Sequence, residues 1–154
     1  MREYHIRPMI QEDLDQVMEI WLSSNLQAHD FVPQDYWTGQ KEAVREMLPK
    51  AQVYVCEYED GSRGKIAGFA GMQEDYLAGI FVAADVRSHG IGSTLLDFCR
   101  QKRKEIVLNV YVRNEAAVRF YERNGFRIEE TDLDPVTGQE EYTMKWCAEN
   151  VTDS

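Results

Sequence analysis

The sequence predicts an α+β domain built on a mixed, mostly antiparallel sheet of about seven strands, flanked by about four helices. Its length of 154 residues is near the commonest domain size, so we expect one domain over residues 1–154. A composition of 44% hydrophobic and 29% charged residues is typical of a soluble globular protein. Alternating and helical segments follow one another in the order β-α-α-β-β-β-α-β-α-β-β, without a repeat or a flexible linker.

The first part of the chain predicts one short strand and two helices. Residues 4–7 alternate and stop at a proline, which favours a strand. Over residues 12–25 the apolar side chains recur at helical spacing, with acidic residues in the first turn. Residues 29–33 break this helix, and we expect a second helix over residues 34–48 that ends at Pro49.

Three strands are predicted next, as an antiparallel meander. Residues 52–58, 65–72 and 76–82 are rich in β-forming side chains, and short turn segments separate them. Residues 87–92 then form a glycine-containing loop that opens an amphipathic helix. The expected buried face of that helix consists of Ile91, Leu95, Phe98 and Cys99.

The last third predicts a central strand, a capped helix and a hairpin. Residues 106–112 are strongly apolar, as expected of a buried strand. Asn114 can cap a helix that Gly125 ends in the left-handed conformation. Residues 126–133 and 141–146 then pair as a hairpin.

The net charge of the chain limits the kinds of partner that we expect it to bind. The chain has 27 acidic and 17 basic residues, a formal net charge of -10. Such a surface repels phosphate backbones, so we expect no binding to nucleic acid or to an anionic membrane. It suits amines or basic peptides, and the acidic run at Glu129, Glu130, Asp132 and Asp134 is either a solvated edge or a surface that steers a cation.

The cysteines indicate a reducing compartment. Cys56, Cys99 and Cys147 are odd in number, widely spaced and without a CxxC pair, which predicts neither disulfides nor a zinc site. The N-terminal segment lacks the apolar run of a signal peptide, and no segment approaches the roughly 20 apolar residues that span a bilayer. We therefore expect a cytoplasmic protein without a metal.

One segment carries a ligand-binding pattern. A predicted strand leads into Arg87-x-x-Gly90-x-Gly92 and directly into a helix. The glycines let the backbone approach a ligand closely, and the free N–H groups of a helix start favour an anion. Together with the basic character of Arg87 and His89, the pattern predicts a cradle for a pyrophosphate.

Other interpretations of this segment are weaker. A lone Gly-x-Gly would also fit an ordinary strand-to-helix turn. A Rossmann site requires a third glycine where Leu95 stands, and it expects a parallel setting instead of a meander. A Walker loop requires Gly-Lys-Ser/Thr, which is absent. The remaining interpretation is an acyl-CoA loop.

Two motifs together resemble one family. Residues 87–92 resemble the Gln/Arg-x-x-Gly-x-Gly/Ala signature of the GNAT acetyltransferases, and residues 114–126 are similar to the family's Asn-x-x-Ala-x-x-x-Tyr-x-x-x-Gly-Phe. The resemblance covers about residues 4–146 in element order. More weakly, the first half resembles a bacterial branch that includes peptidyl-lysine acetyltransferases, at residues 21–22, 28–31 and 36–37.

This resemblance implies a GNAT fold and acetyl-CoA as the cosubstrate. It implies that the strand at Phe81 and Val82 bonds to the pantetheine arm, and that N–H groups over residues 88–93 hold the pyrophosphate. Asn114 matches a position that often contacts CoA, and it can cap its helix at the same time. The expected acetyl-CoA-binding residues are Phe81, Val82, Arg87, Ser88, His89, Gly90, Ile91, Gly92, Ser93 and Asn114.

Tyr121 is the expected catalytic residue. After an amine attacks the thioester, CoA leaves as a thiolate, and a phenol with a pKa near ~10 can donate a proton to it, since the pKa of a thiol is near ~8.5. The family motif implies this role. From the residues alone, Tyr121 could equally be an aromatic on the buried face of its helix.

The general base is open at this point. The pKa of a substrate ammonium is near ~10.4, so a proton must leave before attack. Some relatives place a glutamate where this chain has Asn109, and a neutral amide is no base. His29, Glu74, Asp75 and a water relay to a carboxylate are the candidates.

The sequence thus predicts an N-acetyltransferase that moves the acetyl group of acetyl-CoA to a primary amine by direct attack. The acceptor is a protein lysine, an N-terminus or a small amine, and the protein is a monomer or a homodimer. The alternative from another class is a non-catalytic acyl-CoA-binding sensor with the same fold.

Overall fold

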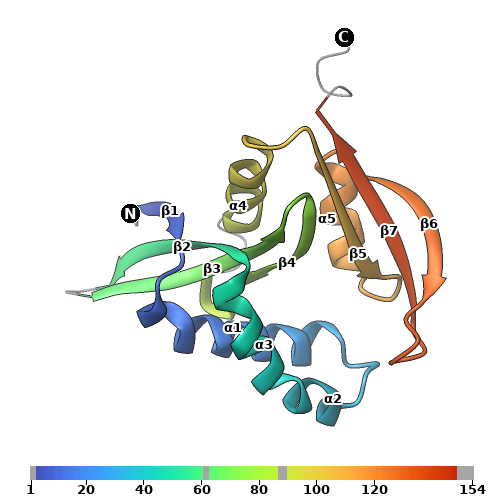
Figure 1. The fold of residues 1–154 in the computed structure, drawn as a ribbon, viewed down its shortest axis with the longest axis horizontal. Helices are drawn as coiled ribbons and strands as arrows, with labels where there is room; N and C mark the ends of the chain where they lie inside the picture. Colours follow the sequence, from blue (N-terminus) through green and yellow to red (C-terminus); the bar gives the residue numbers. More distant parts are fainter. Residues whose placement is uncertain (1–2, 61–62, 87–89, 149–154) are drawn as a thin grey trace.

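The computed structural model describes residues 3–60, 63–86 and 90–148, and its fold confirms the predicted α+β class (Figure 1). One seven-stranded sheet has the order β1-β2-β3-β4-β5-β7-β6, and β4 and β5 form its parallel pair among antiparallel neighbours. The strands are β1 (Tyr4–Pro8), β2 (Gln52–Asp60), β3 (Arg63–Gln73), β4 (Tyr76–Val82), β5 (Glu105–Tyr111), β6 (Arg127–Leu133) and β7 (Glu140–Cys147). The helices are α1 (Leu14–Ala28), α2 (Gln34–Gly39), α3 (Lys41–Met47), α4 (Ile91–Arg100) and α5 (Glu115–Arg123).

The helix expected over residues 34–48 is divided into α2 and α3. The N–H of Gln40 bonds to the carbonyl of Trp37, three residues back, so the first helix closes there. Gly39 directly precedes this break, and glycine has a low helix propensity. Pro49 lies inside a short 3-10 turn that follows α3, instead of directly after the helix.

The sheet has a layer of helices on each face (Figure 1). Along β2, Val53 and Val55 pack in the cluster that includes α1, whereas Tyr54 and Cys56 pack in the cluster that includes α4. This follows from the strand geometry, because successive side chains point to opposite faces. The two clusters are the two cores of the protein.

Helix α4 is amphipathic as predicted, with one change on its buried face. The buried side chains are Ile91, Leu95, Leu96 and Cys99. Phe98, expected among them, is half-buried, and its ring contacts Tyr54 with centroids 4.9 Å apart.

Strands β4 and β5 separate soon after they meet. They pair only at Tyr76 and Leu77 of β4, although β4 continues to Val82 and β5 to Tyr111. Figure 1 shows the two halves of the sheet, β1–β4 and β5–β7, turning away from each other. Over residues 78–82 the side of β4 that faces β5 therefore pairs with no described strand, and its backbone polar groups are available to a ligand.

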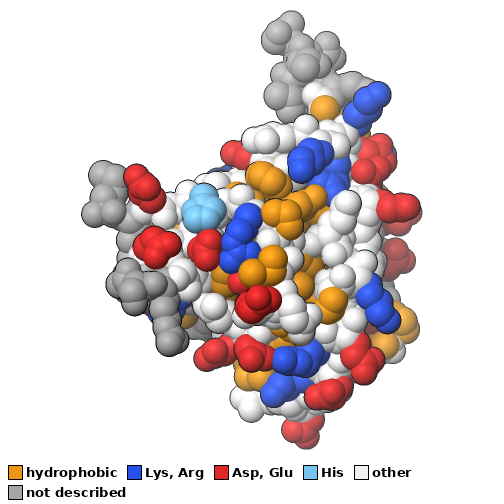
Figure 2. Space-filling model, turned by 60° about the vertical axis from the view of Figure 1, so that its left-hand side comes forward, with side chains coloured by type: hydrophobic (Ala, Val, Ile, Leu, Met, Phe, Trp, Pro, Cys, Tyr) orange, Lys and Arg blue, Asp and Glu red, His pale blue; other side chains and the backbone are white. Residues whose placement is uncertain are grey.

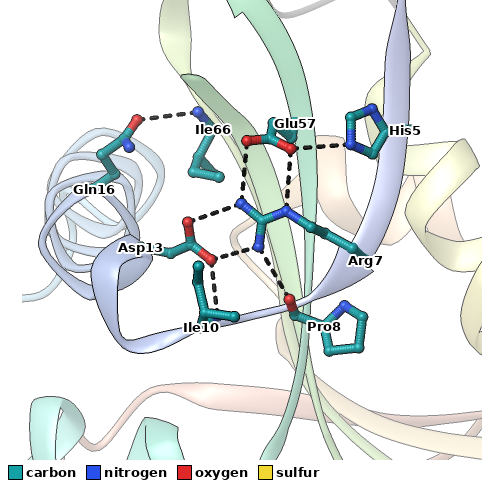
Figure 3. Close-up of polar contacts among 8 residues, drawn as sticks. All are labelled: His5, Arg7, Pro8, Ile10, Asp13, Gln16, Glu57 and Ile66. Atoms are coloured by element: carbon teal, nitrogen blue, oxygen red, sulfur yellow. Dashed lines mark hydrogen bonds and ion pairs between the residues drawn. The ribbon is translucent and has the colours of Figure 1, made fainter. Parts of the chain in front are cut away.

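Arg7 joins three parts of the N-terminal region (Figure 3). Its guanidinium donates to both oxygens of Asp13 (2.7 and 3.0 Å), both oxygens of Glu57 (3.1 and 3.2 Å) and the carbonyl of Pro8 (3.1 Å). Asp13 also accepts from the N–H of Ile10 at 2.8 Å. Every donor of the guanidinium is used, so the start of α1 is fixed to β1 and β2.

The net negative charge is not spread evenly over the surface. Figure 2 shows a face on which acidic and basic side chains alternate around a strip of hydrophobic ones. Strand β6, with the sequence RIEETDL, is exposed along its whole length and concentrates acidic side chains instead. None of the helices in the described ranges is long and apolar enough to cross a membrane.

Candidate active site

A cavity of about 660 Å³ lies where β4 and β5 separate. Its walls come from the last turns of α1, the end of β4, the start of α4 and the chain from Arg113 through α5. It therefore brings parts of the two sequence motifs into one site. The lining residues that matter most are Ser24, His29, Phe81, Val82, Gly92, Asn114 and Tyr121.

Helix α5 presents Tyr121 to this cavity. Asn114 caps the helix as expected, because its Oδ1 accepts from the N–H of Ala117 at 3.4 Å. The Tyr121 ring packs against Phe120 and Phe126, with centroids 5.2 and 5.4 Å away, and the residue is 7% exposed. Its hydroxyl makes no hydrogen bond within the described chain, and burial raises its pKa. Tyr121 is thus both a core aromatic and a protonated group at the cavity.

A second hollow, of about 350 Å³, adjoins the cavity at the start of α4. The two spaces share Val82, Gly92 and Phe120. Gly90 precedes α4 with a φ of 76°, in the left-handed region that favours glycine. Arg123, in the last turn of α5, lines the same hollow. The N–H groups of the first turn of α4 and this guanidinium suit the hollow to an anion.

Most of the expected acetyl-CoA-binding residues lie along these two spaces: Phe81, Val82, Gly90, Ile91, Gly92, Ser93 and Asn114. The side chain of Ile91 is buried in the core, so its backbone is the part that can face a ligand. Arg87, Ser88 and His89 lie outside the described residues.

The residues present fit acetyl-CoA. Residues 78–82 of β4 offer unpaired backbone groups to an extended amide chain, and the hollow at α4 offers N–H groups and Arg123 to a pyrophosphate. Gly92 lines both spaces without a side chain, and a Cβ there would just reach contact with the Phe120 ring, at 3.4 Å. The Oγ of Ser24 is buried at the cavity and has no hydrogen-bond partner in the described chain, as expected of a group that a ligand satisfies.

Carboxylates gather on the sheet beside this cavity. Glu141 of β7 lies opposite Tyr111 of β5 and Asp132 of β6. The Tyr111 hydroxyl donates to Asp134 at 2.7 Å, and its ring contacts His29 of the cavity wall, with centroids 5.1 Å apart. Burial, and then the charges of Asp134 and Asp132, raise the pKa of Glu141. This acidic group suits a cationic ligand that approaches from that side.

A family model described as an acetyltransferase (GNAT) domain matches residues 49–128. The matched range includes both motifs, the opening between β4 and β5, and all of α4 and α5. The chain belongs to the GNAT acetyltransferase family.

Individual GNAT relatives cover nearly the whole chain. The peptidyl-lysine N-acetyltransferase YiaC of Escherichia coli is 34% identical over 92% of this chain and 95% of its own. The peptidyl-lysine N-acetyltransferase YjaB of the same organism is 32% identical over 80% of this chain and 82% of its own. The solution structure of its apo form has a TM-score of 0.81 and covers 94% of this chain and 97% of that one, at 27% identity. Salmonella typhimurium yncA, solved with its cofactor acetyl-CoA, shares the fold at 20% identity, with a TM-score of 0.63 over 95% and 94% of the two chains.

In this GNAT protein the candidates for the general base lie in different places. His29 lines the cavity, but its Nε2 already lies 3.1 Å from the Nδ2 of Asn114, and burial lowers its pKa to about 4, so the ring is a weak base. Glu74 and Asp75 lie in the turn between β3 and β4, at the opposite end of β4 from the cavity. Asn109 is held by hydrogen bonds to side chains of β4 and β7. A water relay to a carboxylate stays a prediction.

Sequence reasoning missed the cavity residues that lie outside the family motifs. Ser24 and Asn25 continue the apolar stripe of α1, four residues after Ile20 and Trp21. A polar residue at an otherwise apolar position of a helix face is the sequence signal that could have identified both residues. The residues missed at the two spaces include Ser24, Asn25, Arg113, Glu115 and Arg123.

Proposed function

We propose that this GNAT protein is a peptidyl-lysine N-acetyltransferase, which transfers the acetyl group of acetyl-CoA directly to the side-chain amine of a lysine in a protein or peptide. The observation that carries the proposal is the cavity at the β4–β5 opening, which gathers Phe81, Val82, Asn114 and Tyr121 around one space. The names of YiaC and YjaB support this class of acceptor. The acidic group on β6 and β7 supports a cationic one.

We further propose that one domain over residues 1–154 carries this activity in the cytoplasm, as a monomer or a homodimer. The support for the compartment is that Cys56, Cys99 and Cys147 are all unpaired, with two of them buried. Reduced thiols are typical of cytosolic proteins.

Acetyl-CoA supplies an activated thioester when it is bound. The free edge of β4 at Phe81 and Val82 bonds to the pantetheine amides, while the start of α4 and Arg123 hold the pyrophosphate. The side-chain amide of Asn114 donates a hydrogen bond to a carbonyl of acetyl-CoA. With these contacts, acetyl-CoA would lie in the cavity that Tyr121 also lines, and the acidic group on β6 and β7 would favour an acceptor lysine.

The chemistry requires the acceptor nitrogen to lose two protons and the sulfur to gain one. The lysine ammonium first loses a proton to a base or to water. The neutral amine nitrogen then forms a bond to the acetyl carbon, a second proton leaves this nitrogen, and the carbon–sulfur bond breaks. Tyr121 donates its hydroxyl proton to the departing sulfur and regains one from the nitrogen or from solvent. Burial raises the pKa of Tyr121, which favours the protonated phenol at neutral pH.

The experiment is release of free CoA thiol from acetyl-CoA with a lysine peptide. Tyr121→Phe should leave acetyl-CoA affinity near wild type and lower kcat by about 10²–10⁴-fold, as for loss of a general acid. Tyr54→Phe is the matched control, because Tyr54 is a buried tyrosine of the same core that lies outside the cavity. Thiol release that stays at background with lysine peptides, despite acetyl-CoA binding, would support the sensor function instead.

A further inference from the structure

A histidine held by aromatic rings lies in the wall of the cavity. His29 is the C-cap residue that directly follows α1. Its ring stacks on Trp37 of α2, with centroids 5.3 Å apart and planes at 28°, and meets Phe31 and Tyr111 edge-on at 5.6 and 5.1 Å. These three contacts restrict rotation of the ring, so its two nitrogens keep fixed directions.

The neighbouring amides determine which ring nitrogen carries the hydrogen. The Nδ2 of Asn25 donates to the carbonyl of Trp21 at 2.9 Å, which leaves its Oδ1 facing the Nδ1 of His29 at 3.0 Å. The Oδ1 of Asn114 accepts from the N–H of Ala117, which leaves its Nδ2 facing the Nε2 of His29 at 3.1 Å. The hydrogen is therefore on Nδ1, and Nε2 is an acceptor.

These bonds form one directed chain between two helices. It runs from the N–H of Ala117 through Asn114, His29 and Asn25 to the carbonyl of Trp21, and every group donates in the same direction. Hydrogen bonds arranged in this way polarise and strengthen one another. The chain connects the start of α5, which carries the acid Tyr121, with the last turns of α1.

The charge state of His29 preserves the chain. Burial lowers its pKa to about 4, so the ring is neutral and Nε2 is an acceptor at neutral pH. Tyr111 of β5 is the titratable residue of another element whose ring contacts His29, and Arg113, Glu115 and Tyr121 are the other titratable residues that line the same cavity. None of these makes a hydrogen bond to the ring within the described chain.

We propose that His29 is a positioning residue for acetyl-CoA binding, because it holds the Asn114 amide in the one orientation that leaves a second N–H for a carbonyl of the ligand. A flipped amide would set Oδ1 against the lone pair of Nε2 and the NH₂ group against the N–H of Ala117, so two hydrogen bonds would be lost. The inference rests on the proposed function, because the ligand is acetyl-CoA.

The first test measures the acetyl-CoA affinity of a set of variants by calorimetry. His29→Phe keeps an aromatic ring against Trp37 but removes the acceptor, and Kd should rise roughly 3–10-fold, the effect of one hydrogen bond. His29→Gln restores an acceptor and a donor and should return Kd close to wild type. His5→Phe, at an exposed histidine on β1, is the control and should leave Kd unchanged. In the double variant, His29→Phe should add nothing to the loss caused by Asn114→Ala.

The second test needs no ligand. Nitrogen NMR of the free protein should show His29 neutral, with its hydrogen on Nδ1, and should show a titration midpoint near pH 4. A hydrogen on Nε2, a Kd unchanged in His29→Phe, or a His29→Gln variant as weak as His29→Phe would each overturn the proposal. Wild-type protein that binds no acetyl-CoA would instead overturn the proposed function and the ligand role with it.

Discussion

Replacing Ser24 by alanine should stabilise the protein and impair it at the same time. Ser24 lies on α1 with 8% of its surface exposed, and its Oγ has no hydrogen-bond partner in the described chain. A serine in a helix often bonds back to a carbonyl of the preceding turn, as the neighbouring Ser23 does with the carbonyl of Ile20 at 3.4 Å. Ser24 does not, and it lines the cavity.

The magnitude follows from the cost of an unsatisfied hydroxyl. Burial of such a group without a hydrogen bond costs about 1–3 kcal/mol, and alanine has a higher helix propensity than serine. Removal of the hydroxyl also removes its packing contacts, which offsets part of this gain. We therefore expect the free energy of unfolding of Ser24→Ala to rise by about 1 kcal/mol. For a chain of this size the melting temperature should rise by about 2–4 °C. If a bound ligand satisfies the hydroxyl, its Kd or KM should rise roughly 3–10-fold.

The assay combines thermal unfolding with acetyl-CoA affinity and the KM for a lysine peptide. Ser23→Ala is the control, because it removes a hydroxyl one residue away that is outside the cavity, and it should change none of these quantities by much. A lower melting temperature for Ser24→Ala would mean that the hydroxyl is already hydrogen-bonded in the folded protein. A higher melting temperature with unchanged affinity and KM would mean that no ligand reaches it.

Three further predictions concern other parts of the molecule. Gly92→Val should weaken acetyl-CoA binding roughly 10-fold or more at unchanged melting temperature. A Cβ at this position already lies 3.4 Å from the Phe120 ring, so the further atoms of valine would overpack the space where the two hollows meet. Tight binding measured by calorimetry would refute this. Burial alone would raise the pKa of Asp13, but hydrogen bonds from Arg7 and a backbone N–H outweigh it, and the net shift is downward. The stabilisation from Asp13 is therefore present above the unfolded-state pKa of about 3.9 and is lost as pH falls through the folded-state pKa. Denaturant unfolding should show Asp13→Asn costing about 1.5–3 kcal/mol at pH 7 and progressively less as pH falls below about 3.9. Burial raises the pKa of Glu141, so the folded protein favours its protonated form, and this stabilisation is lost as pH rises above the unfolded-state pKa of about 4.3. Glu141→Gln should therefore raise the melting temperature at pH 7, while it should also raise the KM for a lysine peptide at low salt. A KM that does not depend on this charge or on salt would contradict electrostatic steering of the acceptor.

Local signals determined much of the fold. The cap at Asn114 and the left-handed Gly125, with a φ of 91°, are both found as predicted, because each depends on the chemistry of a few neighbouring residues. The bounds of β4 agree with the sequence prediction, and the meander of β2, β3 and β4 is confirmed. The division of the expected helix 34–48 was not predicted, although Gly39 is a local signal for it, whereas the burial of Trp37 against Trp21 of α1 depends on tertiary packing.

The family motifs likewise identified the acetyltransferase family, since glycine spacing and the Asn-to-Tyr spacing are local, and most of the residues expected to bind acetyl-CoA line the two adjoining spaces. Only the tertiary structure decided how the other walls are built. Asn114 and His29 are 85 positions apart, yet they share a hydrogen bond. That contact has no spacing of its own, and the helical spacing of α1 marks Ser24 as a polar residue on an apolar face without showing that its hydroxyl lacks a partner. Both arise where β4 and β5 separate, because the last turns of α1 line the cavity at that opening. Strand separation is a property of sheet twist and packing between distant segments, which no short stretch of sequence contains.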